Sequence, residues 1–142
     1  MLYEDMNYLT LSGEKFPIRC DLLVLEKIQD EFGDISEFEN KLIGFFPSKN
    51  EDGTVKKDEE GRTIGMSGTP DIHALIFSLT SMTEEGLRCQ DKEPEEREKL
   101  VRMVDIPPKE LGTILHNEFT RCFRRKNQEP TQNQKTTEKQ SR

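Results

Sequence analysis

The sequence has little that would cross-link it or carry it into a membrane. Its three cysteines, Cys20, Cys89 and Cys122, are odd in number, far apart and without a CxxC pair, so they encode neither a disulfide framework nor a zinc site. No run approaches the roughly 20 apolar residues of a membrane span, and the opening MLYEDMNY lacks the basic and apolar regions of a secretion signal. We therefore expect a soluble cytoplasmic protein without metal, cofactor or membrane contact.

Apolar residues are also scarce, at 32% of 142 residues, whereas charged residues make up 35%. This length suits one domain, and the composition predicts a modest core and a part of the chain that does not pack. The last sixteen residues, NQEPTQNQKTTEKQSR, hold no large apolar side chain. We expect a single domain over residues 1–123 and a polar, disordered tail over residues 124–142.

The charge is negative overall, at −7, and unevenly distributed. Residues 1–123 carry 15 Lys and Arg against 26 Asp and Glu, a net charge of −11, whereas residues 124–142 carry 6 against 2, a net charge of +4. An acidic body repels the phosphate backbone of DNA and RNA, so we expect no nucleic-acid partner.

The chain begins with a predicted hairpin. In YLTLSGEKFPIRC (residues 8–20), apolar and polar residues alternate on both sides of a glycine-containing turn, and Pro17 predicts an edge strand or an outward position. A helix with Asp21 as its N-cap should follow at once, and a two-stranded hairpin needs such support in water. The apolar stripe of this helix consists of Leu22, Leu23, Leu25, Ile28 and Phe32. We expect the hairpin to cover the helix at Leu22, Leu25 and Ile28.

Four more helices are predicted downstream. They are a short helix after Asp34, a buried helix starting at Thr69 and Pro70 and running to about residue 87, a helix from Pro94 to Asp105, and a last helix after Pro107. Residues 48–68 contain four glycines and many charges, which predicts a flexible loop with residues 54–56 and 62–64 as possible strands. The expected fold is α+β, mainly α, with an N-terminal β-hairpin packed on a bundle of about five helices.

No established catalytic or cofactor motif is present in the sequence. The spacing of Gly61, Gly65 and Gly68 lacks the strand and the lysine of a phosphate loop. His116 and Cys122 lie six residues apart on one helix, a rotation of roughly 600° that places them on different faces. The acidic clusters at 58–60 and 93–98 lack the alternate spacing of a calcium loop. We therefore expect a binding protein, not an enzyme.

The order of these elements resembles the tail assembly chaperones of long-tailed, siphovirus-type bacteriophages and prophages. The hairpin YLTLSGEKFPIRC followed directly by DLLVLEKIQDEFG is similar to the strand pair and leucine-rich helix that open those proteins. The segments PDIHALIFSLTSMTEEGL and EPEEREKLVRMVDIPPKELGTILHNEF look like their later helices. The resemblance spans residues 7 to about 123, and the segment 48–68 is longer and more charged than is typical of the family.

The resemblance implies a non-enzymatic role in viral morphogenesis. Such chaperones coat the tape measure protein, help recruit tail tube subunits in the cytoplasm of the bacterial host, and leave before the virion is finished. Contacts with such a partner are expected from apolar side chains that one core need not absorb, although each is equally consistent with the core. These residues are Phe45, Phe46, Met82, Leu87, Phe119 and Phe123. Homo-oligomerisation remains open.

An alternative from another class is a small, acidic, phage-encoded regulatory adaptor that binds one folded host or phage protein. Such an adaptor would use its acidic surface, and the segment with Asp58, Glu59 and Glu60 would be its contact. The position of the gene discriminates, because a chaperone gene lies beside those of the tail proteins and an adaptor gene lies in an early operon.

Overall fold

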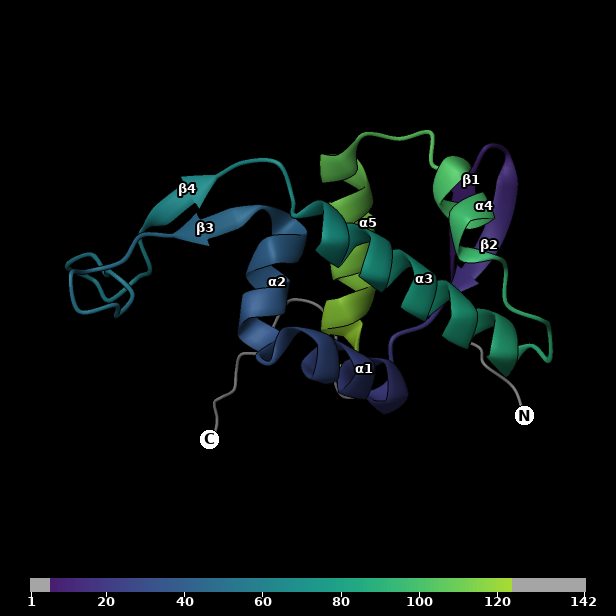
Figure 1. Cartoon of the computed structure of the whole chain (residues 1–142), viewed down its shortest axis with the longest axis horizontal. Helices are drawn as coiled ribbons and strands as arrows, with labels where there is room; N and C mark the ends of the chain where they lie inside the picture. Colours follow the sequence, from purple (N-terminus) through teal and green to yellow (C-terminus); the bar gives the residue numbers. More distant parts are fainter. Residues whose placement is uncertain (1–5, 124–142) are drawn as a thin grey trace, which may run out of the picture.

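Five helices and two antiparallel strand pairs make up residues 6–123, which are the residues that the computed structural model describes (Figure 1). In chain order the elements are β1 (Asn7–Leu11), β2 (Glu14–Ile18), α1 (Leu22–Phe32), α2 (Ile35–Ile43), β3 (Phe45–Pro47), β4 (Gly65–Ser67), α3 (Ile72–Cys89), α4 (Arg97–Arg102) and α5 (Pro108–Arg121). The predicted α+β, mainly helical fold is confirmed. The predicted tail at 124–142 lies outside the described residues.

The N-terminal hairpin has the predicted alternation and turn. β1 pairs antiparallel with β2, with Leu9 opposite Phe16 and both side chains buried. The connection consists of Ser12 and Gly13, at φ 51° and 80°, and two positive φ values are what a tight type I′ turn requires. The turn therefore matches the right-handed twist of the two strands. It also sets the pairing register in which Leu9 and Phe16 lie on the same, buried face of the hairpin.

The hairpin covers α3, and the expectation that it covers the first helix was wrong. The N–H of Arg19 donates to the carbonyl of Met82 at 3.0 Å. A Cβ built on Gly86 would lie 2.5 Å from the carbonyl oxygen of Pro17, so strand and helix meet where α3 has no side chain. Pro17 lies at an edge, as expected, but its side chain is buried against this helix.

The outer face of α1 is the second departure from the sequence prediction. Asp21 caps this helix by accepting a hydrogen bond from the N–H of Val24. The helix then turns Val24 and Ile28 into the core and leaves Leu22 and Leu23 81% and 59% exposed. The predicted stripe was therefore right for Ile28, which is buried, and for Leu25 and Phe32, which pack against the core. It was wrong for Leu22 and Leu23, because Val24 fills the interior in their place.

Two other helices begin later than predicted. α3 begins at Ile72, two residues later than predicted, because the carboxylate of Asp71 accepts from the N–H of Ala74. Pro70 is instead buried near α5, where a Cβ on Gly112 would lie 3.3 Å from its ring. α4 is shorter than predicted and starts after Glu96.

The core is continuous from the hairpin through all five helices. Its largest fully buried side chains include Phe38 of α2, Met82 of α3 and Phe119 of α5, and the rings of Phe38 and Phe119 lie 5.5 Å apart. Among residues 6–123, no helix has the length and apolar character that crossing a bilayer requires.

Residues 45–67 form a second hairpin, the β arm, which projects away from the helices (Figure 1). Beyond the pairing of β3 with β4, bridges join Lys49 to Val55 and Lys57 to Thr63. The strands predicted as possible near 54–56 and 62–64 are therefore present as short bridges, and the segment 45–47 that reads as an apolar junction is the strand β3. Because the arm projects from the helices, a partner could contact it from several sides.

One buried carboxylate ties the hairpin to α5. Glu118 is 1% exposed, and its oxygens accept from the N–H of Cys20 at 2.8 Å and from Nδ2 of Asn7 at 2.6 Å. Arg121 supplies the opposite charge through Nε at 3.0 Å. A buried carboxylate is tolerated only when such donors satisfy it, so the four groups form one unit.

We expect Glu118→Ala to lower the free energy of unfolding by about 3 kcal/mol, because it leaves the buried N–H of Cys20 without its acceptor and removes the ion pair with Arg121. Urea denaturation measures this change. The matched control is Glu98→Ala, which removes a glutamate that is 63% exposed and pairs with Arg102 at 3.8 Å. That variant should change stability by less than about 0.5 kcal/mol, and equal effects of the two substitutions would contradict the role of Glu118.

Candidate functional site

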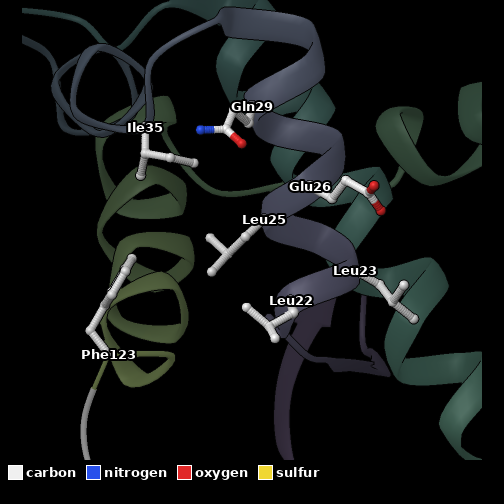
Figure 2. A pocket seen from close by; sticks show the side chains of 7 residues that line it. All are labelled: Leu22, Leu23, Leu25, Glu26, Gln29, Ile35 and Phe123. Atoms are coloured by element: carbon white, nitrogen blue, oxygen red, sulfur yellow. The ribbon is translucent and has the colours of Figure 1, made fainter.

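An open apolar groove lies between α1 and the C-terminal end of α5 (Figure 2). We call it the α1–α5 groove. Its volume is about 390 Å³, and its lining consists of Leu22, Leu23, Leu25, Glu26, Gln29, Ile35 and Phe123. Figure 2 shows Leu25 and Gln29 extending from α1 toward the side of α5 that carries Phe123, whereas Leu23 and Glu26 leave the other side of α1.

The groove is apolar because three of its lining residues have large apolar side chains that remain in solvent. Leu22, Leu23 and Phe123 are 81%, 59% and 61% exposed. Single exposed leucines are ordinary on protein surfaces, but a cluster around a concave site is typical of a surface that binds a partner. The chain therefore has an uncovered apolar site on its helical face.

The groove has a firm support. The ring of Phe123 lies 5.3 Å from the ring of buried Phe119, in an edge-to-face arrangement. Leu25 and Ile35 are partly buried and pack against the core. A ligand in the groove would meet side chains held by the interior, which lowers the entropy cost of ordering them on binding.

The six predicted contact residues do not form one site. Met82, Leu87 and Phe119 are 0%, 7% and 1% exposed and belong to the core, which was the alternative for each of them. Phe46 is 45% exposed on the β arm, beside half-buried Phe45. Phe123 alone lines the α1–α5 groove.

Sequence reasoning missed the leucines of the groove. Leu22 and Leu23 were assigned to the core with Leu25, although the run LLVL places four consecutive apolar residues on a helix. A helix on a protein surface buries only one stripe, so such a run must leave some members outside. The excess of apolar residues in this run therefore indicated an exposed apolar site on the helix. It did not show which of the leucines face the solvent.

The β arm carries a smaller apolar patch and an acidic tip. Phe46 and Met66 stand opposite each other across the strands, and Met66 is 73% exposed. At the tip, Arg62 pairs with Asp58 at 3.0 Å and with Glu60 at 3.1 Å. The acidic cluster that the adaptor alternative requires is therefore partly neutralised within the arm.

Both histidines bind carboxylates of neighbouring helices. His116 Nε2 lies 2.8 Å from Oε2 of Glu39, and His73 Nε2 lies 2.7 Å from Oε2 of Glu31. The ring of His116 also stacks on that of Phe119, with centroids 6.0 Å apart. These contacts join α5 to α2 and α3 to α1, which is a structural role.

In the described part of the chain, Asp21, Glu85 and Cys89 place potential metal-ligand atoms within 4.8 Å of one another. The carboxylate of Asp21 already accepts from Val24 and pairs with Arg19 at 3.3 Å, and the thiol of Cys89 lies 3.7 Å from Glu85. Burial, reinforced by nearby Asp21, raises the pKa of Glu85. The three residues lie together because Asp21 caps α1 and Cys89 bonds to Glu85 on α3. We therefore assign no metal to this cluster.

The chain matches no protein-family model, no curated protein and no solved structure.

The thiols of Cys20 and Cys122 form a hydrogen bond that shifts their pKa values in opposite directions. Accepting this bond lowers the pKa of Cys122, whereas the same bond together with burial raises the pKa of Cys20. Cys122 is therefore thiolate at a lower pH than an ordinary cysteine, and we expect iodoacetamide to alkylate it there while Cys20 stays unreacted.

Cys20→Ala should shift the alkylation of Cys122 to higher pH, because the donor is lost. Mass spectrometry of alkylation rates across pH measures this shift, with the half-buried Cys89 as the internal control. An unchanged pH profile of Cys122 in the variant would show that the two thiols are not coupled.

Proposed function

We propose that the protein is a non-enzymatic tail assembly chaperone of a long-tailed phage or prophage, which binds the tape measure protein and helps recruit tail tube subunits. The observation that carries the proposal is the α1–α5 groove, where Leu22, Leu23 and Phe123 are exposed around a concave site. The resemblance of residues 7–123 to such chaperones supports the same role.

Binding through this groove needs no chemistry beyond burial of apolar surface. A tape measure protein is mostly helical and exposes apolar stripes until the tail tube surrounds it. A short amphipathic helix laid into a groove buries its anchors at i, i+3, i+4 and i+7. Leu22, Leu25 and Ile35 would cover such a stripe, each buried side chain contributing about 1.5–3 kcal/mol before the cost of association.

The net charge of −7 fits this role in two ways. Free copies repel one another and stay dispersed, and long-range attraction guides them to basic segments of a partner. We place the protein in the cytoplasm of the bacterial host during tail assembly and outside the finished virion.

The regulatory adaptor remains the second candidate, and the β arm is the observation that favours it. The arm projects from the body (Figure 1). Phe46 and Met66, which pair across its strands, are both exposed. A folded partner could bind it from several sides. Variants of the groove and of the arm therefore discriminate the two functions.

We expect co-expression with the tape measure protein encoded in the same genome to give a complex and to increase the soluble fraction of that protein. The double variant Leu22→Ser/Phe123→Ser should lower the recovered complex at least about tenfold, since two anchors worth more than 1.4 kcal/mol are lost. Pull-down followed by quantitative gel analysis measures the yield.

The matched control is Met66→Ser, which removes an apolar side chain as exposed as those of the groove but on the arm. It should leave the yield unchanged. The chaperone proposal fails if wild type gives neither complex nor increased solubility, and the adaptor is favoured if only the arm variant loses its partner.

A further inference from the structure

One edge of the α1–α5 groove is acidic. Glu26 lines the groove, and Asp30 follows one turn later on the same side of α1. Both side chains belong to exposed residues, and Figure 2 shows Glu26 leaving α1 on the side opposite to Phe123. The groove thus has an acidic edge along α1 and an apolar wall formed by Ile35 and Phe123.

The charges of this edge are not neutralised within residues 6–123. Neither Glu26 nor Asp30 has an ion-pair partner there. Lys27, the single basic residue of α1, is turned toward α3, where it pairs with Glu84 at 3.6 Å. Within the described part of the chain, the edge therefore presents two carboxylates without an ion-pair partner, one helical turn apart beside an apolar site.

We propose that the α1–α5 groove selects an amphipathic helix whose apolar stripe is flanked on one side by Lys or Arg residues spaced one turn apart. The apolar stripe would cover Leu22, Leu25 and Phe123, and the basic flank would lie against Glu26 and Asp30. This inference deepens the proposed function and rests on its assignment of the groove as the binding site.

The dimensions and charges of the groove favour this occupant. The lining of α1 runs from Leu22 to Gln29, which is about 10 Å of helix, so it accommodates about two turns of a partner. A second copy of the chain fits less well, because a symmetric pairing of α1 with α1 would bring Glu26 and Asp30 of both copies together. Opposite charge at the edge sets the orientation of a basic helix in the groove.

The test uses two synthetic helical peptides of about 14 residues, roughly 21 Å of helix, with the same leucine stripe and with either lysine or glutamate at every polar position. Fluorescence anisotropy measures their affinity for the whole protein. We expect the lysine peptide to bind at least tenfold more tightly than the glutamate peptide, and added salt to reduce that preference.

Two variants locate the site. Glu26→Lys/Asp30→Lys should abolish the preference for the lysine peptide or reverse it toward the glutamate peptide. Leu22→Ser should lower the affinity for the lysine peptide without changing the fold. The matched control is Glu98→Lys/Glu110→Lys, which makes the same change in net charge at exposed positions on α4 and α5. It should retain most of the preference.

Several outcomes would overturn the inference. Equal affinity for both peptides would show that the groove does not select a basic helix. An equal loss of the preference in the control variant would show that the preference comes from non-specific attraction by net charge. A dimer seen by sedimentation and dissolved by Leu22→Ser would assign the groove to a second copy of the chain.

The inference and the proposed function can fail separately. If the lysine peptide binds the groove but the tape measure protein does not, the selection of a basic amphipathic helix is supported and the chaperone role is rejected. If the tape measure protein binds and reversal of Glu26 and Asp30 has no effect, the chaperone role stands and the acidic edge is not what selects its partner.

Discussion

The buried carboxylate of Glu118 fixes how the hairpin meets the helices. It accepts from Asn7 at the start of β1 and from Cys20 just after β2, so the open end of the hairpin is held on α5. Arg121 compensates its charge from the same helix. With that end fixed, β2 lies along α3, where Gly86 allows the backbones to approach. Removal of the carboxylate would take a hydrogen-bond acceptor from both ends of the hairpin at once, which is why one side chain matters to the whole arrangement.

The functional surface follows from this placement. Because the hairpin covers α3, it leaves the outer face of α1 exposed, and Leu22 and Leu23 remain in solvent. Phe123, which follows α5, lies across the groove from α1 (Figure 2). Helix α1 also supplies the carboxylates of Glu26 and Asp30, which have no ion-pair partner within residues 6–123. Apolar anchors and a charged edge thus come from a single short helix, and the interior supports them through Phe119.

The local features of the chain were predictable from its residues, whereas the packing between elements was not. The alternation in residues 8–20 and the turn at Ser12 and Gly13 predicted the hairpin, and Asp21 and Asp34 predicted two helix starts, all of which the structure contains. The face that α1 buries depends on which helix the hairpin covers, and that depends on Gly86 and Glu118, which lie far along the chain from α1. For the same reason, one of the six predicted contact residues, Phe123, proved to line the groove, while Leu22 and Leu23 were missed.

The central claim is that the α1–α5 groove is the partner-binding surface of the protein. Hydrogen exchange of the protein alone and in the presence of the tape measure protein from the same genome tests this claim most directly. The account predicts slower exchange in residues 22–29 and 119–123, with the β arm at 45–67 unchanged. Slower exchange confined to the arm, or no change anywhere, would contradict it.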